Sequence, residues 1–117
     1  MNSRKIAFRP WMALLIIALF AQVWVSAAND GEAAFLGENS AAMSKMMAAM
    51  AVQPAGDVDR DFVAAMVPHH QGAIEMAQAE LRYGRNQQLR RLAQEIIVEQ
   101  TQEIAAMRMA VEQESPK

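Results

Sequence analysis

The sequence contains no cysteine, which excludes disulfides and thiolate metal sites. Aromatic residues make up only 6% of the chain, and leucine, ordinarily the commonest residue of proteins, is scarce after residue 30. No segment alternates apolar and polar residues as a half-buried strand does. What is present is 117 residues, 53% of them hydrophobic and 21% charged. A chain of this size and composition forms at most one small domain.

The long apolar run of the chain lies near its start. Residues 11–25 contain one polar residue, Gln22, and three basic residues with no acid precede them. Small residues follow at 26–28, where a signal peptidase cuts. The run is shorter than the roughly 18–20 residues that cross a bilayer. We therefore expect residues 1–27 to be a cleaved signal peptide of a periplasmic or secreted protein. Membrane attachment is expected only if this segment is retained as an anchor.

The charge that remains after residue 27 is mildly acidic, because the basic residues of the signal are lost with it. No basic stripe is left, which argues against nucleic acid as a partner. The polar, aperiodic stretch that follows predicts a flexible leader over residues 28–38. Residues 39–117 then carry the periodic patterns of a folded domain.

Three segments of that domain have apolar residues at helical spacing, which indicates an all-α fold. A short helix begins at Asn39 or Ser40 and ends near residues 53–56. A second runs from the acidic residues at 57–61 to Gly84, and a third begins after Asn86. The linker between the last two is so short that they should form an antiparallel hairpin. Because so few helices bury little surface, a homo-oligomer that completes a larger bundle is possible.

Polar residues interrupt the apolar stripes of both long helices. A projection at 100° per residue places His69 and His70 at the border of one stripe, and Gln100 and Glu103 on the other. The hairpin should bring His70 near Gln100, to within about a turn. Buried polar groups need partners, so either a hydrogen-bond network or a metal site is expected there. Imidazole, thioether and carboxylate together are a plausible ligand set.

Methionine is unusually frequent, with ten residues in the chain. On the first helix of the domain, a stripe spans one face and consists of Met43, Met46, Met47 and Met50. Such a stripe is either soft core packing or a surface of sulfur ligands for copper(I). The histidine pair likewise has an ordinary explanation, a polar rim whose hydrogen bonds are satisfied.

The segment DFVAAMVPHHQGAIEMA, followed by LRRLAQEIIVEQTQEIAAM, strongly resembles the domain of unknown function 305 family (DUF305), whose members are exported ferritin-like helical proteins, some of them copper-binding. The resemblance covers about half of the chain. One departure concerns the tryptophan that family members often carry soon after the last motif methionine, since Arg108, Met109, Ala110 and Val111 stand there instead.

The resemblance implies a copper-binding protein, not an enzyme, that acts in copper tolerance or trafficking. It favours the role of metal ligands for His69, His70, Met66, Met76 and Met107. Glu103 and the stripe of Met43, Met46, Met47 and Met50 complete the candidate ligands. Two alternatives stay open: a structural helical module that binds a partner helix through methionines, and a carboxylate-bridged metalloenzyme. The second usually needs a Glu three residues before a His, which this sequence lacks.

Overall fold

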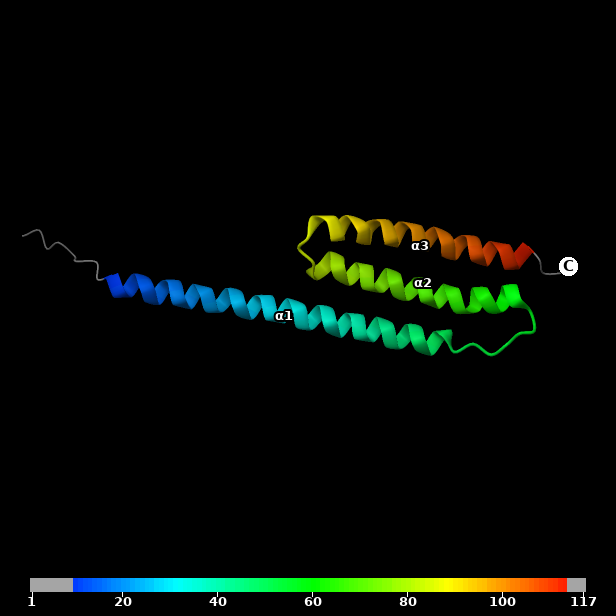
Figure 1. Cartoon of the computed structure of the whole chain (residues 1–117), viewed down its shortest axis with the longest axis horizontal. Coiled ribbons are helices and arrows are strands. Elements are labelled where there is room, and N and C mark those ends of the chain that lie inside the picture. The colour runs from blue at the N-terminus through cyan, green and yellow to red at the C-terminus, as the bar shows by residue number, and fades with distance from the viewer. Residues whose placement is uncertain (1–9, 114–117) are drawn as a thin grey trace, which may run out of the picture. The chain divides into compact units, whose positions relative to one another are not determined.

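The structure is a computed structural model that describes the backbone of residues 10–113 and the side chains of residues 30–113. Three helices follow one another in this part of the chain (Figure 1): α1 spans Pro10–Met50, α2 spans Val58–Tyr83 and α3 spans Gln87–Gln113. The predicted all-α fold is therefore confirmed. Residues 1–32 and residues 33–117 are separate compact units, and the packing described below belongs to the second unit.

Helices α2 and α3 form the predicted antiparallel hairpin. Asp57 caps α2, because its Oδ1 accepts hydrogen bonds from the backbone N–H groups of Asp59 and Arg60 at 3.0 and 3.1 Å. Asn86 caps α3 in the same way, through the N–H groups of Gln88 and Leu89. These side-chain acceptors satisfy backbone donors that have no partner within a first helical turn. Both caps were predicted from the sequence.

The turn between the helices is closed by Arg90. Its guanidinium donates to the carbonyl oxygens of Leu81 and Gly84, which lie at the end of α2. Glycine is required at 84 for space, because an added Cβ would lie 2.6 Å from the backbone oxygen of Glu80. The reversal is therefore held from both sides: by the cap of α3 and by a charged side chain on the final carbonyls of α2.

The prediction of a flexible leader over residues 28–38, with a short helix beginning at 39 or 40, is wrong. The stretch is helical and belongs to α1, which is 41 residues long. The physical reason is tertiary contact. The carboxylate of Glu38 accepts hydrogen bonds from Arg82 and Tyr83 of α2, and Phe35 lines a groove beside α2. These contacts outweigh the weak helix preference of Gly31 and Gly37.

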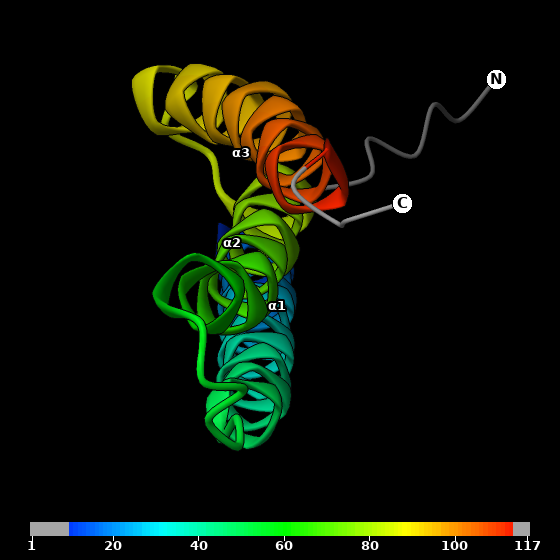
Figure 2. The ribbon, with the colours of Figure 1, turned by 90° about the vertical axis from the view of Figure 1, so that its right-hand side faces the viewer.

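Helix α2 lies between α3 and the part of α1 that covers residues 33–50, as both views show (Figures 1 and 2). The apolar side chains buried between these helices are mostly small. Four are alanines and two are isoleucines: Ala42, Ala77, Ala79, Ala93, Ile74 and Ile104. Among the described residues, no large side chain is fully buried. The core of a single chain is therefore thin.

The predicted signal peptide lies largely beyond what the structure describes. Residues 1–9 fall outside the described residues, and of residues 10–27 only the helical backbone is described. In the remainder, where side chains are described, no helix is long and apolar enough to cross a membrane. Cleavage after residue 27 stays a prediction.

Candidate metal centre

His70 joins the two helices of the hairpin and is the one buried polar residue in the described part of the chain, with 8% of its surface exposed. Its Nδ1 lies 2.9 Å from the carbonyl oxygen of Met66, one turn earlier in α2. Its Nε2 lies 2.7 Å from Oε2 of Glu103 in α3. The sequence predicted Gln100 as the neighbour, so the observed partner is one turn further along, within the stated uncertainty.

The two contacts of His70 constrain where hydrogen lies on the ring. A carbonyl oxygen can only accept, so Nδ1 carries a hydrogen and donates it to Met66. Nε2 then faces a carboxylate, which also only accepts. Lone pairs on Nε2 and Oε2 cannot face each other at 2.7 Å without repulsion. At this distance a hydrogen bond joins the two atoms, so a proton lies between His70 and Glu103.

Two methionines lie one helical turn from this pair, on the side away from the turn between the helices. Met66 is four residues before His70 and Met107 is four residues after Glu103, so the antiparallel register that pairs His70 with Glu103 also pairs the methionines. Both are half-buried, whereas the Glu103 side chain is 56% exposed. The register thus places one imidazole, one carboxylate and two thioethers on two adjacent turns of the hairpin.

Other predicted ligands lie elsewhere. His69 is exposed, and its ring contacts that of His70 edge to face with centroids 5.9 Å apart. Met76 lies six residues beyond His70, about 9 Å along α2. It lines the same groove as Phe35. In the described part of the chain, no three His, Asp or Glu side chains converge as a metal site.

The methionine stripe of α1 is divided between two environments. Met43 and Met47 are 47% and 60% exposed, whereas Met46 and Met50 are half-buried. Met46 packs against Gly72 of α2, where an added Cβ would lie 2.8 Å from its sulfur. Met46 therefore belongs to the packing between α1 and α2, while the sulfurs of Met43 and Met47 belong to side chains that reach the surface.

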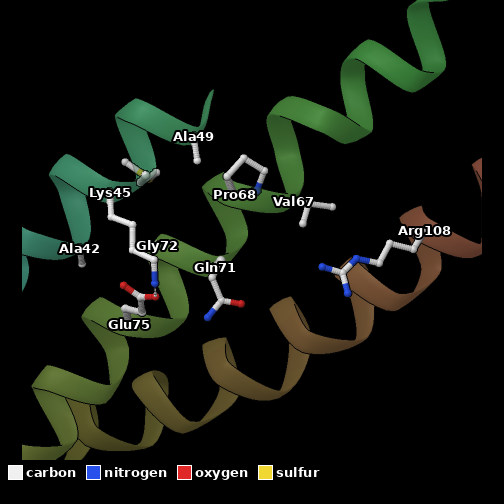
Figure 3. A pocket seen from close by; sticks show the side chains of 10 residues that line it. Ala42, Lys45, Ala49, Val67, Pro68, Gln71, Gly72, Glu75 and Arg108 are labelled. Atoms are coloured by element: carbon white, nitrogen blue, oxygen red, sulfur yellow. Dashed lines mark hydrogen bonds and ion pairs between the residues drawn. The ribbon is translucent and has the colours of Figure 1, made fainter. Parts of the chain in front are cut away.

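The contact of Met46 with Gly72 lies beside a cavity of about 210 Å³ between α1 and α2. Figure 3 shows Lys45 of α1 paired with Glu75 of α2 at one side of this cavity. Arg108 reaches toward it from α3. This cavity and the His70 site lie on different faces of α2, so its charged side chains do not contribute to the candidate metal centre.

A third cluster, beside the turn of the hairpin, was not found from the sequence. The Tyr83 hydroxyl donates to Oε1 of Glu38 at 2.7 Å, and the Arg82 guanidinium donates to Oε2. The hydrogen bonds from Tyr83 and then Arg82 lower the pKa of the Glu38 carboxyl. The bond to Glu38 in turn raises the pKa of the Tyr83 hydroxyl. No sequence motif links positions 44 or 45 residues apart, so only the fold reveals this cluster.

Comparison with known proteins supports the resemblance found in the motifs. No match was found among curated proteins. Residues 21–111 match the family model described as domain of unknown function (DUF305), and the matched range includes the part of α1 that replaces the predicted leader. Because that range covers well over half of the 117 residues, the chain belongs to the DUF305 family.

Proposed function

We propose that this protein is an exported copper-binding protein that holds the ion at His70 without catalysing a reaction, in copper tolerance or trafficking. The observation that carries the proposal is the contact of His70 Nε2 with the Glu103 carboxylate at 2.7 Å. The contact aims an imidazole lone pair and a carboxylate at one point, and a metal ion that replaces the shared proton would have both as ligands. A metal ion is the cation that an imidazole nitrogen and a carboxylate bind together.

The second contact of His70 supports the same role. Histidines that bind metals usually donate their other N–H to a carbonyl or carboxylate, which fixes the tautomer and the direction of the free lone pair. The bond from Nδ1 to the Met66 carbonyl has this form. The side chain of Glu103 is 56% exposed and is free to move aside for an ion larger than a proton.

The thioethers of Met66 and Met107 favour copper over other metals. Sulfur ligands of this kind select copper(I), whereas imidazole and carboxylate suit copper(II). Two adjacent turns of the hairpin offer both kinds of ligand: His70 is buried, Met66 and Met107 are half-buried, and Glu103 is exposed. Copper(I) would be held by His70 with the two methionines, and copper(II) by His70 with Glu103.

The exposed methionines of α1 extend the proposal. Met43 and Met47 lie one turn apart on the same face, so both sulfurs can reach one ion at the surface. We propose that they bind copper(I) as a second, weaker site. Met46 and Met50 are half-buried, and the contact of Met46 with Gly72 supports a packing role for that residue.

The location proposed for this activity is the periplasm or the exterior of the cell. Support comes from residues 1–27, which combine basic residues, a short apolar run and small residues in the order of a signal peptide. In an oxidising compartment, methionine and histidine remain available as ligands because they do not form disulfides.

Equilibrium dialysis against copper(II), and against copper(I) with a reductant, tests the proposal on three proteins: the wild type, His70→Gln and His69→Gln. The two histidines are adjacent, but only His70 faces Glu103. We expect His70→Gln to lose copper(II) retention and His69→Gln to keep it. Circular dichroism on each variant checks that the helices remain. Equal retention by all three proteins, or no retention by the wild type, would refute a site at His70.

A further inference from the structure

The three helices of the second unit leave α2 uncovered on two opposite faces. One face carries the cavity beside Met46, and the other carries a groove of about 310 Å³. On a helical projection, the residues of α2 that line the cavity and those that line the groove point in opposite directions. Because α2 lies between α1 and α3 (Figure 2), no helix among the described residues covers the groove.

The groove is apolar and has a floor of small residues. Ala73 and Ala77 form one turn of that floor, and Ala93 adds a third small side chain from α3. Asn39 of α1 also lines it, and its Oδ1 is buried without a hydrogen-bond partner in the described structure. A buried oxygen without a partner destabilises the fold, because it has lost its hydrogen bonds to water. Among the described residues, the groove therefore has neither a hydrogen-bond donor for Asn39 nor an apolar side chain that covers its floor.

The rim of the groove is formed by leucines of α3 that water still reaches. Leu89 is 52% exposed and Leu92 is 50% exposed. Both belong to the apolar stripe that the sequence predicts as the core face of α3. Only Ala93 and Ile104 of that helix are buried in the single chain. An apolar stripe that stays half exposed next to an apolar groove indicates an interface.

We propose that the groove is covered by α3 of a second copy of this chain, packed antiparallel on the first copy with the two-fold axis near Leu92. A two-fold interface uses the same patch on both copies, so it must carry both a ridge and a groove. Leu89 and Leu92 are the ridge, and the groove lies directly beside them. Each copy inserts its leucines into the groove of the other.

The charges around Leu92 fit this arrangement. Arg85 lies in the linker, just before the cap of α3 at Asn86, and Glu99 lies in α3 seven residues after Leu92; both are exposed. In an antiparallel pair centred on Leu92, the start of α3 in one copy lies beside the stretch of α3 that carries Glu99 in the other. The long side chain of Arg85 is then within reach of Glu99, twice per dimer. A parallel pair would instead place like charges opposite each other, which is unfavourable. The antiparallel two-fold arrangement therefore buries the leucines and also pairs opposite charges.

The dimer leaves the candidate metal centre accessible. Glu103 and Met107 lie beyond Glu99, toward the end of α3 away from the two-fold axis. Copper binding and dimerisation thus use different stretches of the helix, and neither proposal depends on the other.

Cross-linking of single-cysteine variants tests the dimer directly, because the chain has no cysteine of its own. In the full-length protein, Leu92→Cys is compared with Val98→Cys, which is 56% exposed on the same helix but lies away from the groove lining. A short bis-maleimide should cross-link Leu92→Cys into dimers and leave Val98→Cys monomeric. Both variants keep the apolar N-terminal segment, so association through that segment would affect them equally. Equal cross-linking of both variants, or none of either, would overturn the proposal.

Charge reversal tests the antiparallel orientation. In the Leu92→Cys protein, Arg85→Glu should reduce the cross-linked fraction at least several-fold, and adding Glu99→Arg should restore it. The repulsion introduced by the first change is removed by the second. If the single reversal has no effect, or if the double reversal fails to restore cross-linking, the antiparallel pairing is wrong.

Discussion

His70 and Glu103 are 33 residues apart in the sequence and are joined by a 2.7 Å contact between Nε2 and Oε2. The contact links α2 to α3 about half-way along the hairpin, because His70 is at the midpoint of α2. The imidazole is buried, whereas the carboxylate is mostly exposed. This asymmetry means that the histidine is held in place by the fold, while the glutamate can respond to what binds beside it.

The Glu103 carboxylate should matter more for copper(II) than for folding. Because the side chain is exposed, Glu103→Gln should lower the free energy of unfolding by less than about 1 kcal/mol. Its loss removes a negatively charged ligand, so copper(II) affinity should fall about tenfold or more. Chemical denaturation and a competitive copper titration measure the two effects. The control is Glu95→Gln, an exposed residue of the same helix, which should change neither. An unchanged affinity in Glu103→Gln would remove Glu103 from the ligand set.

Gly72 should be intolerant of a side chain because α1 packs directly on it. An added Cβ would lie 2.8 Å from the Met46 sulfur and 2.9 Å from the Met46 Cβ. We expect Gly72→Ala to lower the free energy of unfolding by about 1–3 kcal/mol, despite the better helix propensity of alanine. The control is Gly37→Ala in α1, where an added Cβ would meet nothing within 4 Å. That change should raise stability by up to about 1 kcal/mol. Equal stabilisation by both changes would mean that α1 does not pack against α2 at Gly72.

The cluster around Glu38 should make stability depend on pH in the acid range. The pKa of Glu38 is lowered from the value of 4.5, mainly by the hydrogen bond from Tyr83. A carboxyl with a lowered folded-state pKa contributes stability above pH 4.5 and loses it as the pH falls through the folded-state value. Thermal unfolding of wild type and Glu38→Gln should therefore differ at pH 6 and converge toward pH 3. A difference that persists undiminished at pH 3 would contradict this account.

Tyr83 should contribute a second pH dependence in the alkaline range. Its pKa is raised from 10.0 by the hydrogen bond that it donates to Glu38. A raised folded-state pKa gives stability that is present below pH 10.0 and is lost as the pH rises through the folded-state value. Tyr83→Phe should remove this alkaline loss while leaving the helices intact. Spectrophotometric titration of the single tyrosine measures the pKa directly, and a value at or below 10 would refute the contact.

The exposed methionines of α1 can be tested without disturbing the helix. Leucine matches methionine closely in helix propensity and volume, so Met43→Leu together with Met47→Leu should leave stability almost unchanged. If both sulfurs bind copper(I), the number of ions bound should fall while the His70 site persists. Met109→Leu is the control, because this methionine is 56% exposed on α3. An unchanged copper(I) stoichiometry would favour the alternative in which the stripe contacts a partner helix.

The hairpin could be predicted because its signals are local. Asp57 and Asn86 cap helices through neighbouring backbone groups, and the three-residue linker permits only a tight reversal. The pairing of the two helices followed from counting residues back from that reversal. The count named Gln100 instead of Glu103, because the width of a turn is not set by the number of linker residues alone.

The start of α1 could not be predicted because it depends on contacts between distant residues. Residues 28–38 contain two glycines and no helical apolar stripe, which is the local pattern of a linker. The helix is instead held by Glu38 on Arg82 and Tyr83. Gly72 offered the one local signal for this packing, since a glycine inside a long helix often marks a close approach.

The sequence alone could not decide which of the candidate ligands face the site. Helical projection placed His69 and His70 symmetrically at the border of one stripe, and the side on which α3 packs decides between them. In the structure His70 is buried and His69 is exposed. Met76 also has the right chemistry, but its distance along α2 from His70 becomes decisive only once the partner of His70 is known.

The most direct test of the copper site is NMR spectroscopy of the protein labelled at methionine methyl groups and imidazole nitrogens, titrated with copper(I), which is diamagnetic. We expect the signals of His70 Nε2 and of the methyl groups of Met66 and Met107 to shift together and to saturate when one equivalent of copper(I) has been added. The signals of His69 and Met76 should move little over that range. Saturating shifts confined to His69 or to other methionines, with His70 unchanged, would contradict a metal centre between α2 and α3.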